Sequence, residues 1–427
     1  MTAFTTLEAL PMDPIFALLA AYNNDPHPSK VSLGVGVYKT NEAQNYTLPS
    51  VRQAMKLLAE DPTFDHDYLP LAGYAPLIAH AKRIVFGPDS PVPFSNIASI
   101  QTISGTGAVH TAARFLFEQL PPISSTSPGQ TTRRIWISNP TWGNHHTIFE
   151  HAVTSKASSP IEQKFYPYYD PNTCSLDFKG LVDTLERESN NGDIILLHAC
   201  AHNPTGIEPN RDQWKVIADI CKRKGLFPFF DIAYQGFASG DLDRDAWAIR
   251  EFTAQGLECA VAQSFSKNLG LYGQRVGVLH IVCADEDTAK KAATQTVEIQ
   301  RSEISMPPSY GARVANVVLS DPELSRQWRE DMKEMSGRII SMRQALFDEL
   351  TALGTPGSWK HIVEQVGMFS YTGLTVEQIR KLREQYHIYL LDSSRASISG
   401  LNTKNVQYVA KAIDAVVRET TKSQSQL

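Results

Sequence analysis

The chain has 427 residues, of which 42% are hydrophobic and 20% are charged, and its formal net charge is −5. This composition excludes a disordered chain or a coiled coil, and the negative charge argues against a nucleic-acid-binding surface. The length predicts two or three structural units, and we expect ligands that are small molecules.

The five cysteines are widely spaced and form no CxxC pair, which indicates neither disulfides nor a zinc site. The N-terminal stretch Met1–Asp13 has no basic residue and therefore resembles neither a secretory signal nor a transit peptide. The longest apolar run, Val276–Ala284, is too short to cross a membrane. We expect a soluble protein of a reducing compartment, with no membrane partner.

The first predicted helix follows Asp13-Pro14, which has the form of an N-cap with proline at the first helical position, and it covers Ile15–Tyr22. Val31–Tyr38 then reads as an extended segment interrupted by glycines. Gly34 and Gly36 would allow the backbone to approach a ligand closely. A twisted strand with a bulge explains the same residues equally well.

Short apolar runs alternate with helical patterns from Ile97 to Val282, as expected for a parallel sheet built from βα units. Apolar spacing of 3.6 residues predicts helices over Gly107–Leu120 and Gln213–Lys224. The predicted strands are Ile97–Ile103, Arg134–Ser138, Ile194–His198, Leu226–Phe230, Ala260–Gln263 and Val276–Val282. The fold class is therefore α/β, and this part is the large domain.

After Pro307-Pro308 the pattern changes, and Asp321–Leu350 predicts one long helix. The last hundred residues predict a smaller α+β domain that includes the N-terminal helix. Its elements are a strand at Gly367–Tyr371, a helix at Thr375–Tyr386, a short strand at Ile388–Leu391 and a helix at Lys404–Thr420. We expect an N-terminal arm at 1–12, small-domain residues at 13–45 and 321–427, and a large domain at 46–320.

One lysine, Lys267, stands between two serines and an arginine in Gln263–Gly277, which reads QSFSKNLGLYGQRVG. A lysine amine can condense with an aldehyde cofactor, and a nearby cation such as Arg275 lowers its pKa and can hold a phosphate. The segment follows a predicted strand, and open α/β sheets bind ligands at the carboxyl ends of their strands. The alternative is an ordinary solvated lysine.

Ser104-Gly105-Thr106-Gly107 follows a strand and opens a helix, which brings hydroxyls and free backbone N–H groups to a helix N-terminus suited to phosphate. Ser264 and Arg275 could supply further phosphate ligands. An ordinary N-cap turn is the alternative.

Asp231 ends the apolar strand Leu226–Phe230, where a carboxylate would be costly to bury without a cation. A protonated pyridine nitrogen would be such a cation, and a carboxylate there would keep the ring an electron sink. Tyr234 could then bond the opposite edge of the ring. A helix N-cap is the alternative role for Asp231.

Two further strands end in polar motifs, HNPTG at 202–206 and NPTWGNH at 139–145. Asn203 is a functional candidate or a turn former. Trp142 could cover a cofactor ring and His145 could support Asp231, although a core tryptophan and a structural histidine are ordinary alternatives. The pair His145-His146 lacks spaced acidic partners, so we predict no metal site.

These motifs occur in one order and together resemble the aspartate aminotransferases of the class I, fold type I pyridoxal-phosphate-dependent family over most of Asp13–Thr420. The matching segments are Gly34–Gly36, Tyr68-Leu69-Pro70, Ser104–Gly107, Asn139–His145, His202–Gly206, Asp231–Tyr234, Ser264–Arg275 and Ser394-Arg395. The resemblance implies a large domain with a mostly parallel seven-stranded sheet flanked by helices, a smaller α+β domain and pyridoxal 5′-phosphate as cofactor.

The resemblance also assigns roles to single residues. The catalytic residues would be Lys267, Asp231, Tyr234 and Tyr68. The cofactor would be held by Ser104, Gly105, Thr106, Trp142, Asn203, Asp231, Tyr234, Ser264, Lys267, Arg275 and Tyr68. The substrate would be held by Gly36, Trp142, Asn203, Arg301 and Arg395. Arg395 would clamp the α-carboxylate and Arg301 the distal carboxylate, and Tyr68 and Arg301 would be lent to the neighbouring subunit of a homodimer.

The sequence departs from the family pattern near these residues. Ile304 and Met306 stand where tyrosine and asparagine are common, Ser397 stands shortly after Arg395 where asparagine is usual, and Tyr46 replaces a tryptophan. The catalytic residues are intact, and the substrate is the property that these changes affect.

The resemblance implies a ping-pong aminotransferase in which aspartate or glutamate gives its amino group to a 2-oxo acid such as 2-oxoglutarate or oxaloacetate. A transaminase of aromatic or neutral amino acids, or a decarboxylase, lyase or carbon–carbon bond-forming enzyme with the same cofactor, is the alternative. An interaction protein without catalysis is disfavoured because the expected cofactor ligands are present. The C-terminal Ser425-Gln426-Leu427 resembles a degenerate peroxisomal signal that lacks the usual base, which favours the cytosol.

Overall fold

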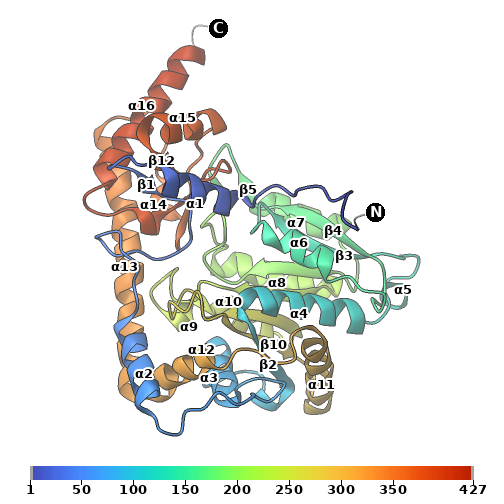
Figure 1. Cartoon of the computed structure of the whole chain (residues 1–427). Helices are drawn as coiled ribbons and strands as arrows, with labels where there is room; N and C mark the ends of the chain where they lie inside the picture. Colours follow the sequence, from blue (N-terminus) through green and yellow to red (C-terminus); the bar gives the residue numbers. More distant parts are fainter. Residues whose placement is uncertain (1–2, 425–427) are drawn as a thin grey trace.

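A seven-stranded sheet forms the centre of the computed structural model, which describes residues 3–424 (Figure 1). In sequence its strands are β2 (Ile97–Ile103), β3 (Arg133–Asn139), β4 (Ile161–Pro167), β7 (Ile194–His198), β8 (Phe227–Ile232), β9 (Cys259–Ser264) and β10 (Val276–Val282). In space the order is β2-β10-β9-β8-β7-β3-β4, and β10 runs in the opposite direction to the other six strands. The predicted mostly parallel seven-stranded sheet is confirmed.

Both faces of the sheet are buried, because alternate residues of one strand belong to different hydrophobic clusters. Ile194 and Leu196 of β7 belong to the same buried cluster as apolar residues of helices α4 (Ser104–Gln119) and α11 (Glu286–Glu303). Ile195 and Leu197 belong to the cluster that includes residues of α3 (Ala75–Phe86), α8 (Arg211–Lys224) and α10 (Trp247–Ala254). The helices therefore cover both faces of the sheet and leave the strand ends open.

Strand β4 is the one strand of this sheet that the apolar pattern does not reveal. Its sequence IEQKFYP is largely polar, and most of its residues are half-buried or exposed. It lies at the sheet edge, where one side faces solvent and a continuous apolar run is not required.

The long helix α13 (Pro322–Ala352) agrees with the predicted helix over 321–350 to within two residues at its C-terminal end. It begins with Asp321 accepting the N–H groups of Glu323 and Leu324, and Pro322 occupies the first helical position. It contacts α2 (Pro49–Glu60) and α12 (Tyr310–Ser320) near its start and α16 (Val406–Gln424) further along (Figure 1).

The N-terminal segment lies among the C-terminal elements, as the blue and red ribbons show (Figure 1). Strand β1 (Val31–Ser32) pairs in parallel with β12 (Ile388–Tyr389). Of the extended segment expected over Val31–Tyr38, only Val31–Ser32 forms a strand, although the Leu33 N–H still reaches the Tyr389 carbonyl at 2.7 Å. The chain bends at Gly34, whose carbonyl accepts from Arg395. The predicted strand Ile388–Leu391 is likewise shortened by a turn in which the Ser394 N–H reaches the Leu391 carbonyl.

The remaining elements are short or lie around the sheet. The helices are α1 (Pro14–Asn24), α5 (Ile123–Thr126), α6 (Asn144–His151), α7 (Phe178–Glu188), α9 (Leu242–Asp245), α14 (His361–Glu364) and α15 (Val376–Tyr386), with 3₁₀ turns at Phe94–Asn96 and Ile398–Gly400. The strands are β5 (Tyr169–Asp170), paired with β6 (Ser175–Leu176), and β11 (Phe369–Tyr371), paired with β13 (Arg395–Ser397).

Candidate active site

A cavity of about 230 Å³ lies at the carboxyl ends of the central strands. This is the edge where open α/β sheets place their ligands. Its lining contains every predicted cofactor ligand except Tyr68, together with residues that the sequence did not single out. The lining residues are Ser104, Gly105, Thr106, Trp142, His198, Cys200, Asn203, Asp231, Ala233, Tyr234, Ser264, Ser266, Lys267, Tyr272 and Arg275.

Lys267 lies in the turn that follows β9, with its Nζ 4.6 Å from the ring centre of Tyr234. Burial lowers the pKa of the Lys267 amine to about 8. The Asp231 carboxylate works against this shift, and the positive charges of Arg275 and Arg395 add to it. The amine is therefore far closer to its neutral, nucleophilic form at neutral pH than a solvated lysine is.

Asp231 lies within β8, and its side chain is buried. Burial by itself would raise the pKa of Asp231, but the hydrogen bond from His145 and the charges of His145 and Lys267 lower it below its usual range. The His145 Nε2 lies 3.0 Å from Asp231 Oδ2. The carboxylate thus bonds a histidine rather than capping a helix, and it stays ionised at the floor of the cavity.

A chain of hydrogen bonds continues behind Asp231. Thr141 Oγ1 lies 2.9 Å from His145 Nδ1 and 3.0 Å from His198 Nε2. His198 is the last residue of β7 and stands beside Asp231 in the strand register. Its burial lowers the pKa of His198 to about 3, so it is neutral. The chain fixes the ring of His145 and thereby the orientation of the carboxylate.

The opposite end of the cavity is formed by the N-terminus of α4. No side chain caps this helix, so the N–H groups that follow Ser104 in the first turn stay available to a ligand. Arg275 donates to the Ser104 hydroxyl, and the Ser104 N–H donates to the Arg275 carbonyl at 3.0 Å. A Cβ at Gly105 would lie 2.9 Å from the Ser264 Cβ, which requires glycine there. Backbone donors, hydroxyls and a cation therefore converge on one point.

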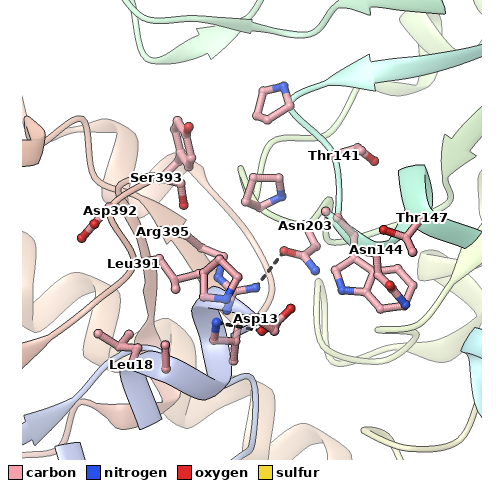
Figure 2. Close-up of a pocket in the computed structure, with 18 of the residues that line it drawn as sticks. Asp13, Leu18, Thr141, Asn144, Thr147, Asn203, Leu391, Asp392, Ser393 and Arg395 are labelled. Carbon is pink, nitrogen blue, oxygen red and sulfur yellow. Dashed lines mark hydrogen bonds between the residues drawn. The ribbon is translucent and has the colours of Figure 1, made fainter. Parts of the chain in front are cut away.

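A second cavity of about 770 Å³ adjoins the first at Trp142 and Asn203 and reaches Arg395 and helix α1 (Figure 2). The Arg395 guanidinium is 4% exposed and donates to Asn203 Oδ1 at 3.2 Å and to the Gly34 carbonyl at 2.7 Å. Its Nε has no hydrogen-bond partner among residues 3–424. A buried cation with an unused donor is suited to an incoming carboxylate.

Gly36 lines neither cavity, but it lies against the Phe369 ring, which in turn packs against Arg395. A Cβ there would lie 2.7 Å from the Phe369 ring, and that ring lies 4.1 Å below the Arg395 guanidinium. The structure therefore gives Gly36 a supporting place under Arg395.

Tyr68 and Arg301 are not brought to these cavities within one chain. Tyr68 is 84% exposed, and Arg301 is exposed in the last turn of α11 with its guanidinium on the Ser305 hydroxyl. The segments that follow them contact each other, since the Leu69 N–H reaches Met306 Sδ at 3.1 Å. We call the exposed surface formed by these two segments, with Tyr68 and Arg301, the rim.

The sequence reading missed Thr141, His198 and Tyr272. His198 could have been found, because it ends a predicted strand at the ligand-binding edge. Tyr272 gave no signal of its own; its hydroxyl accepts the Tyr38 N–H at 3.0 Å from a distant part of the chain.

Residues 3–424 hold no group of three or more His, Cys, Asp or Glu side chains that could bind a metal ion. Over the same residues, no helix is both long and apolar enough to span a membrane.

Comparison with known proteins gives the family. The model for "Aminotransferase class I and II" matches residues 28–413. An L-tyrosine:2-oxoglutarate aminotransferase of Aspergillus ustus is 47% identical over 97% of this chain and 78% of its own. The structure of an aspartate aminotransferase from Saccharomyces cerevisiae cytoplasm superposes with a TM-score of 0.91 at 42% identity, covering 97% of this chain and 98% of that one.

An aromatic-amino-acid aminotransferase from Burkholderia pseudomallei, covalently bound to pyridoxal phosphate, superposes with a TM-score of 0.90 at 38% identity. The match covers 98% of this chain and 100% of that one. With a family model spanning most of its length and relatives of this similarity, the chain belongs to the class I and II aminotransferase family.

Proposed function

We propose that this protein is a pyridoxal-phosphate-dependent aspartate aminotransferase, which moves the amino group of aspartate or glutamate to a 2-oxo acid by a ping-pong reaction. The observation that carries the proposal is the shared cavity of Lys267 and Asp231. An amine with a lowered pKa faces an ionised buried carboxylate there, beside a phosphate-binding helix N-terminus. An L-tyrosine aminotransferase and an aspartate aminotransferase among its relatives support the reaction class.

The donor set fits pyridoxal phosphate. The uncapped α4, Ser264 and Arg275 would hold its phosphate, and Asp231 would pair with its pyridine nitrogen. Tyr234 and Asn203 would reach its phenolic oxygen, with Trp142 against the ring. When bound, this cofactor supplies an aldehyde for the substrate amine and an electron-withdrawing ring that stabilises negative charge at the substrate Cα.

Lys267 would act twice, first as the residue that holds the cofactor and then as the base that takes the proton from the substrate Cα. Its pKa of about 8 suits both roles, because a neutral amine is present at neutral pH and its conjugate acid can return the proton. Asp231 would keep the pyridine nitrogen protonated, and His145 would hold Asp231 in place at 3.0 Å.

Arg395 would bind the substrate α-carboxylate, using the Nε that has no partner among residues 3–424. Its neighbour Asn203, at 3.2 Å, would fix the guanidinium between the substrate and the cofactor cavity. This arrangement serves any α-amino acid and does not by itself select a side chain.

Selection of a distal carboxylate would come from Arg301 of a second copy of the chain. Arg301 and Tyr68 lie exposed on one rim and do not line the cavities of their own chain. A homodimer in which each subunit lends these two residues to its neighbour would bury them and complete both sites. The exposed Tyr68 ring is an apolar surface that such an interface would cover.

Tyrosine is the second candidate substrate. Ile304 and Met306 place apolar side chains beside Arg301, and Ile304 lines a further cavity of about 460 Å³ with Thr106 and Arg275. Such a rim suits an aromatic ring better than a polar rim does. The 47% identity with an L-tyrosine:2-oxoglutarate aminotransferase supports this alternative.

Purified enzyme supplied with 2-oxoglutarate and either aspartate or tyrosine tests both proposals. Oxaloacetate and glutamate as products, with a higher kcat/KM for aspartate, would support the first. A higher kcat/KM for tyrosine would favour the second. Release of carbon dioxide or a new carbon skeleton would instead identify a lyase or a carbon–carbon bond-forming enzyme.

We also propose cytosolic localisation and a domain division at 1–12, 13–45, 46–320 and 321–427. The cytoplasmic source of the yeast relative supports the former. The β1–β12 pairing supports the inclusion of the N-terminal segment in the small domain. The C-terminal Ser425-Gln426-Leu427 lies outside the described residues, and a fluorescent fusion with and without it tests the location.

A further inference from the structure

An acidic side chain lines the substrate cavity near Arg395. Asp13 precedes α1, and its Oδ1 accepts the N–H groups of Ile15 at 2.8 Å and Phe16 at 3.3 Å. It lines the cavity of about 770 Å³ together with Arg395, and the close-up shows the two side chains on neighbouring walls (Figure 2). A carboxylate at the entrance to a site for anionic substrates is unexpected, because like charges repel.

Arg395 has no ion-pair partner of its own in the part of the chain that the structure describes. Its hydrogen bonds go to the neutral acceptors Asn203 Oδ1 and the Gly34 carbonyl. Burial lowers the pKa of Arg395, whereas the Tyr234 hydroxyl and the Asp13 carboxylate raise it. Asp13 and Arg395 thus line the same cavity, and the charge of the carboxylate stabilises this guanidinium.

The other acid on the cavity wall does not compete for this role. Asp392 pairs with Arg383, which also lines the cavity, so its charge is met locally. Asp13 makes no ion pair with residues 3–424, and its side chain accepts hydrogen bonds from the backbone of α1. Its negative charge is therefore free to act across the cavity.

We propose that Asp13 is the resting counter-charge of Arg395, a positioning residue that weakens binding of the substrate α-carboxylate and so eases exchange of product for the next substrate. The inference rests on the proposed function, in which Arg395 receives that carboxylate. A ping-pong enzyme exchanges one acid for another in each half-reaction, so a carboxylate held too tightly would slow turnover. The substrate carboxylate must enter a cavity in which the charge of Asp13 already stabilises the guanidinium.

A matched set of variants separates this role from simple helix capping. Asn caps a helix as well as Asp does, so Asp13→Asn removes the charge and keeps the cap. Asp13→Glu keeps the charge and changes the cap. Asp212→Asn removes one charge from an α8 side chain that is 91% exposed and lines neither cavity, and it serves as the control.

The experiment measures succinate binding to each holoenzyme, because succinate carries two carboxylates and no reactive amino or oxo group. We expect Asp13→Asn to bind succinate about two- to tenfold more tightly at low salt, with the gain reduced near 1 M salt by screening. Asp13→Glu and Asp212→Asn should bind as the unaltered enzyme does. KM for aspartate and for alanine should fall by the same factor in Asp13→Asn, since the effect concerns the shared α-carboxylate, and kcat should not rise.

Equal succinate affinity in Asp13→Asn and the unaltered enzyme at low salt would overturn the proposal, as would the same gain in Asp212→Asn. Thermal unfolding of Asp13→Asn at the temperature of the unaltered enzyme would verify that the cap is intact. The variant Arg395→Leu tests separately whether Arg395 binds the carboxylate and whether Asp13 weakens that binding. If that variant still binds succinate normally, the assignment of Arg395 fails; if it loses binding while Asp13→Asn is silent, only the role of Asp13 fails.

Discussion

The cofactor cavity is formed by residues of one chain, whereas Tyr68 and Arg301 of the exposed rim line neither the cofactor cavity nor the substrate cavity of their own chain. In the cavity, Lys267 and Asp231 lie at strand ends of a sheet buried on both faces, and their partners come from the same chain. On the rim, Tyr68 is 84% exposed, and the Arg301 guanidinium donates to the hydroxyl of Ser305, four residues further along the chain. Under the proposed function, the chemistry would be encoded within one subunit, whereas selection of the substrate side chain would require two.

Loss of the Lys267 amine should have the largest effect, because no other lysine of the described residues 3–424 lines the cavity. We expect Lys267→Ala to lower kcat by at least about four orders of magnitude. Steady-state kinetics with aspartate and 2-oxoglutarate measure this, with circular dichroism as the control for folding. A rate within tenfold of the unaltered enzyme would remove the central role of this lysine.

Removal of the Asp231 carboxylate should come next, since the pyridine nitrogen would lose the group that keeps it protonated. We expect Asp231→Ala to lower kcat by roughly three orders of magnitude. Asp231→Glu retains a carboxylate and should recover part of the loss. Near-normal turnover in Asp231→Ala would mean that the carboxylate has only a structural role.

Replacement of Arg301 should lower kcat/KM for some amino acids far more than for others. This unequal effect distinguishes a residue of the rim from the residues of the cofactor cavity, which act on every substrate. Removing one partner of a desolvated arginine–carboxylate pair costs roughly 3–5 kcal/mol, which corresponds to a loss of about two to four orders of magnitude in kcat/KM. We expect Arg301→Leu to lose about this much with aspartate and glutamate and far less with phenylalanine or alanine. Arg395→Leu, the matched control, should penalise all four amino acids, and an unaltered substrate ranking in Arg301→Leu would disprove the dicarboxylate assignment.

The smallest expected effect concerns pH. The lowered pKa of Lys267 leaves its amine protonated below about pH 8 and neutral above it. The rate at which the apoenzyme takes up pyridoxal phosphate should therefore rise up to about pH 8 and then level off, whereas an ordinary lysine would gain until about pH 10.4. Stopped-flow absorbance measures this rate.

Asp231→Asn sharpens the pH prediction. The Asp231 carboxylate raises the pKa of Lys267 against the effect of burial, so its neutralisation should move the midpoint of uptake to lower pH. A midpoint that stays in place, or moves upward, would show that Asp231 does not act on the amine.

Features that follow from local sequence patterns could be predicted, whereas features that depend on contacts between distant segments could not. Asp231 and Lys267 follow apolar strands, and the geometry of parallel sheets brings the ends of those strands to one edge, so the cavity was predictable from local patterns. Strand β4 was missed because an edge strand needs no apolar run. The bend that interrupts the expected extended segment at Gly34 was not predicted, because the Gly34 carbonyl bonds Arg395, a residue 361 positions away. The hydrogen-bond chain through Thr141 also depends on contacts between distant segments, which no local pattern encodes.

The most direct test of the shared site mixes two inactive variants. Arg301→Leu and Arg395→Leu protomers, unfolded together and refolded, should form heterodimers in which one site has both arginines and the other has neither. Random pairing predicts recovery of about a quarter of the unaltered activity with aspartate, since half of the dimers would each carry one complete site. Absence of recovery, with heterodimers verified by mass spectrometry, would place Arg301 in its own subunit's site or outside any site and would contradict the account.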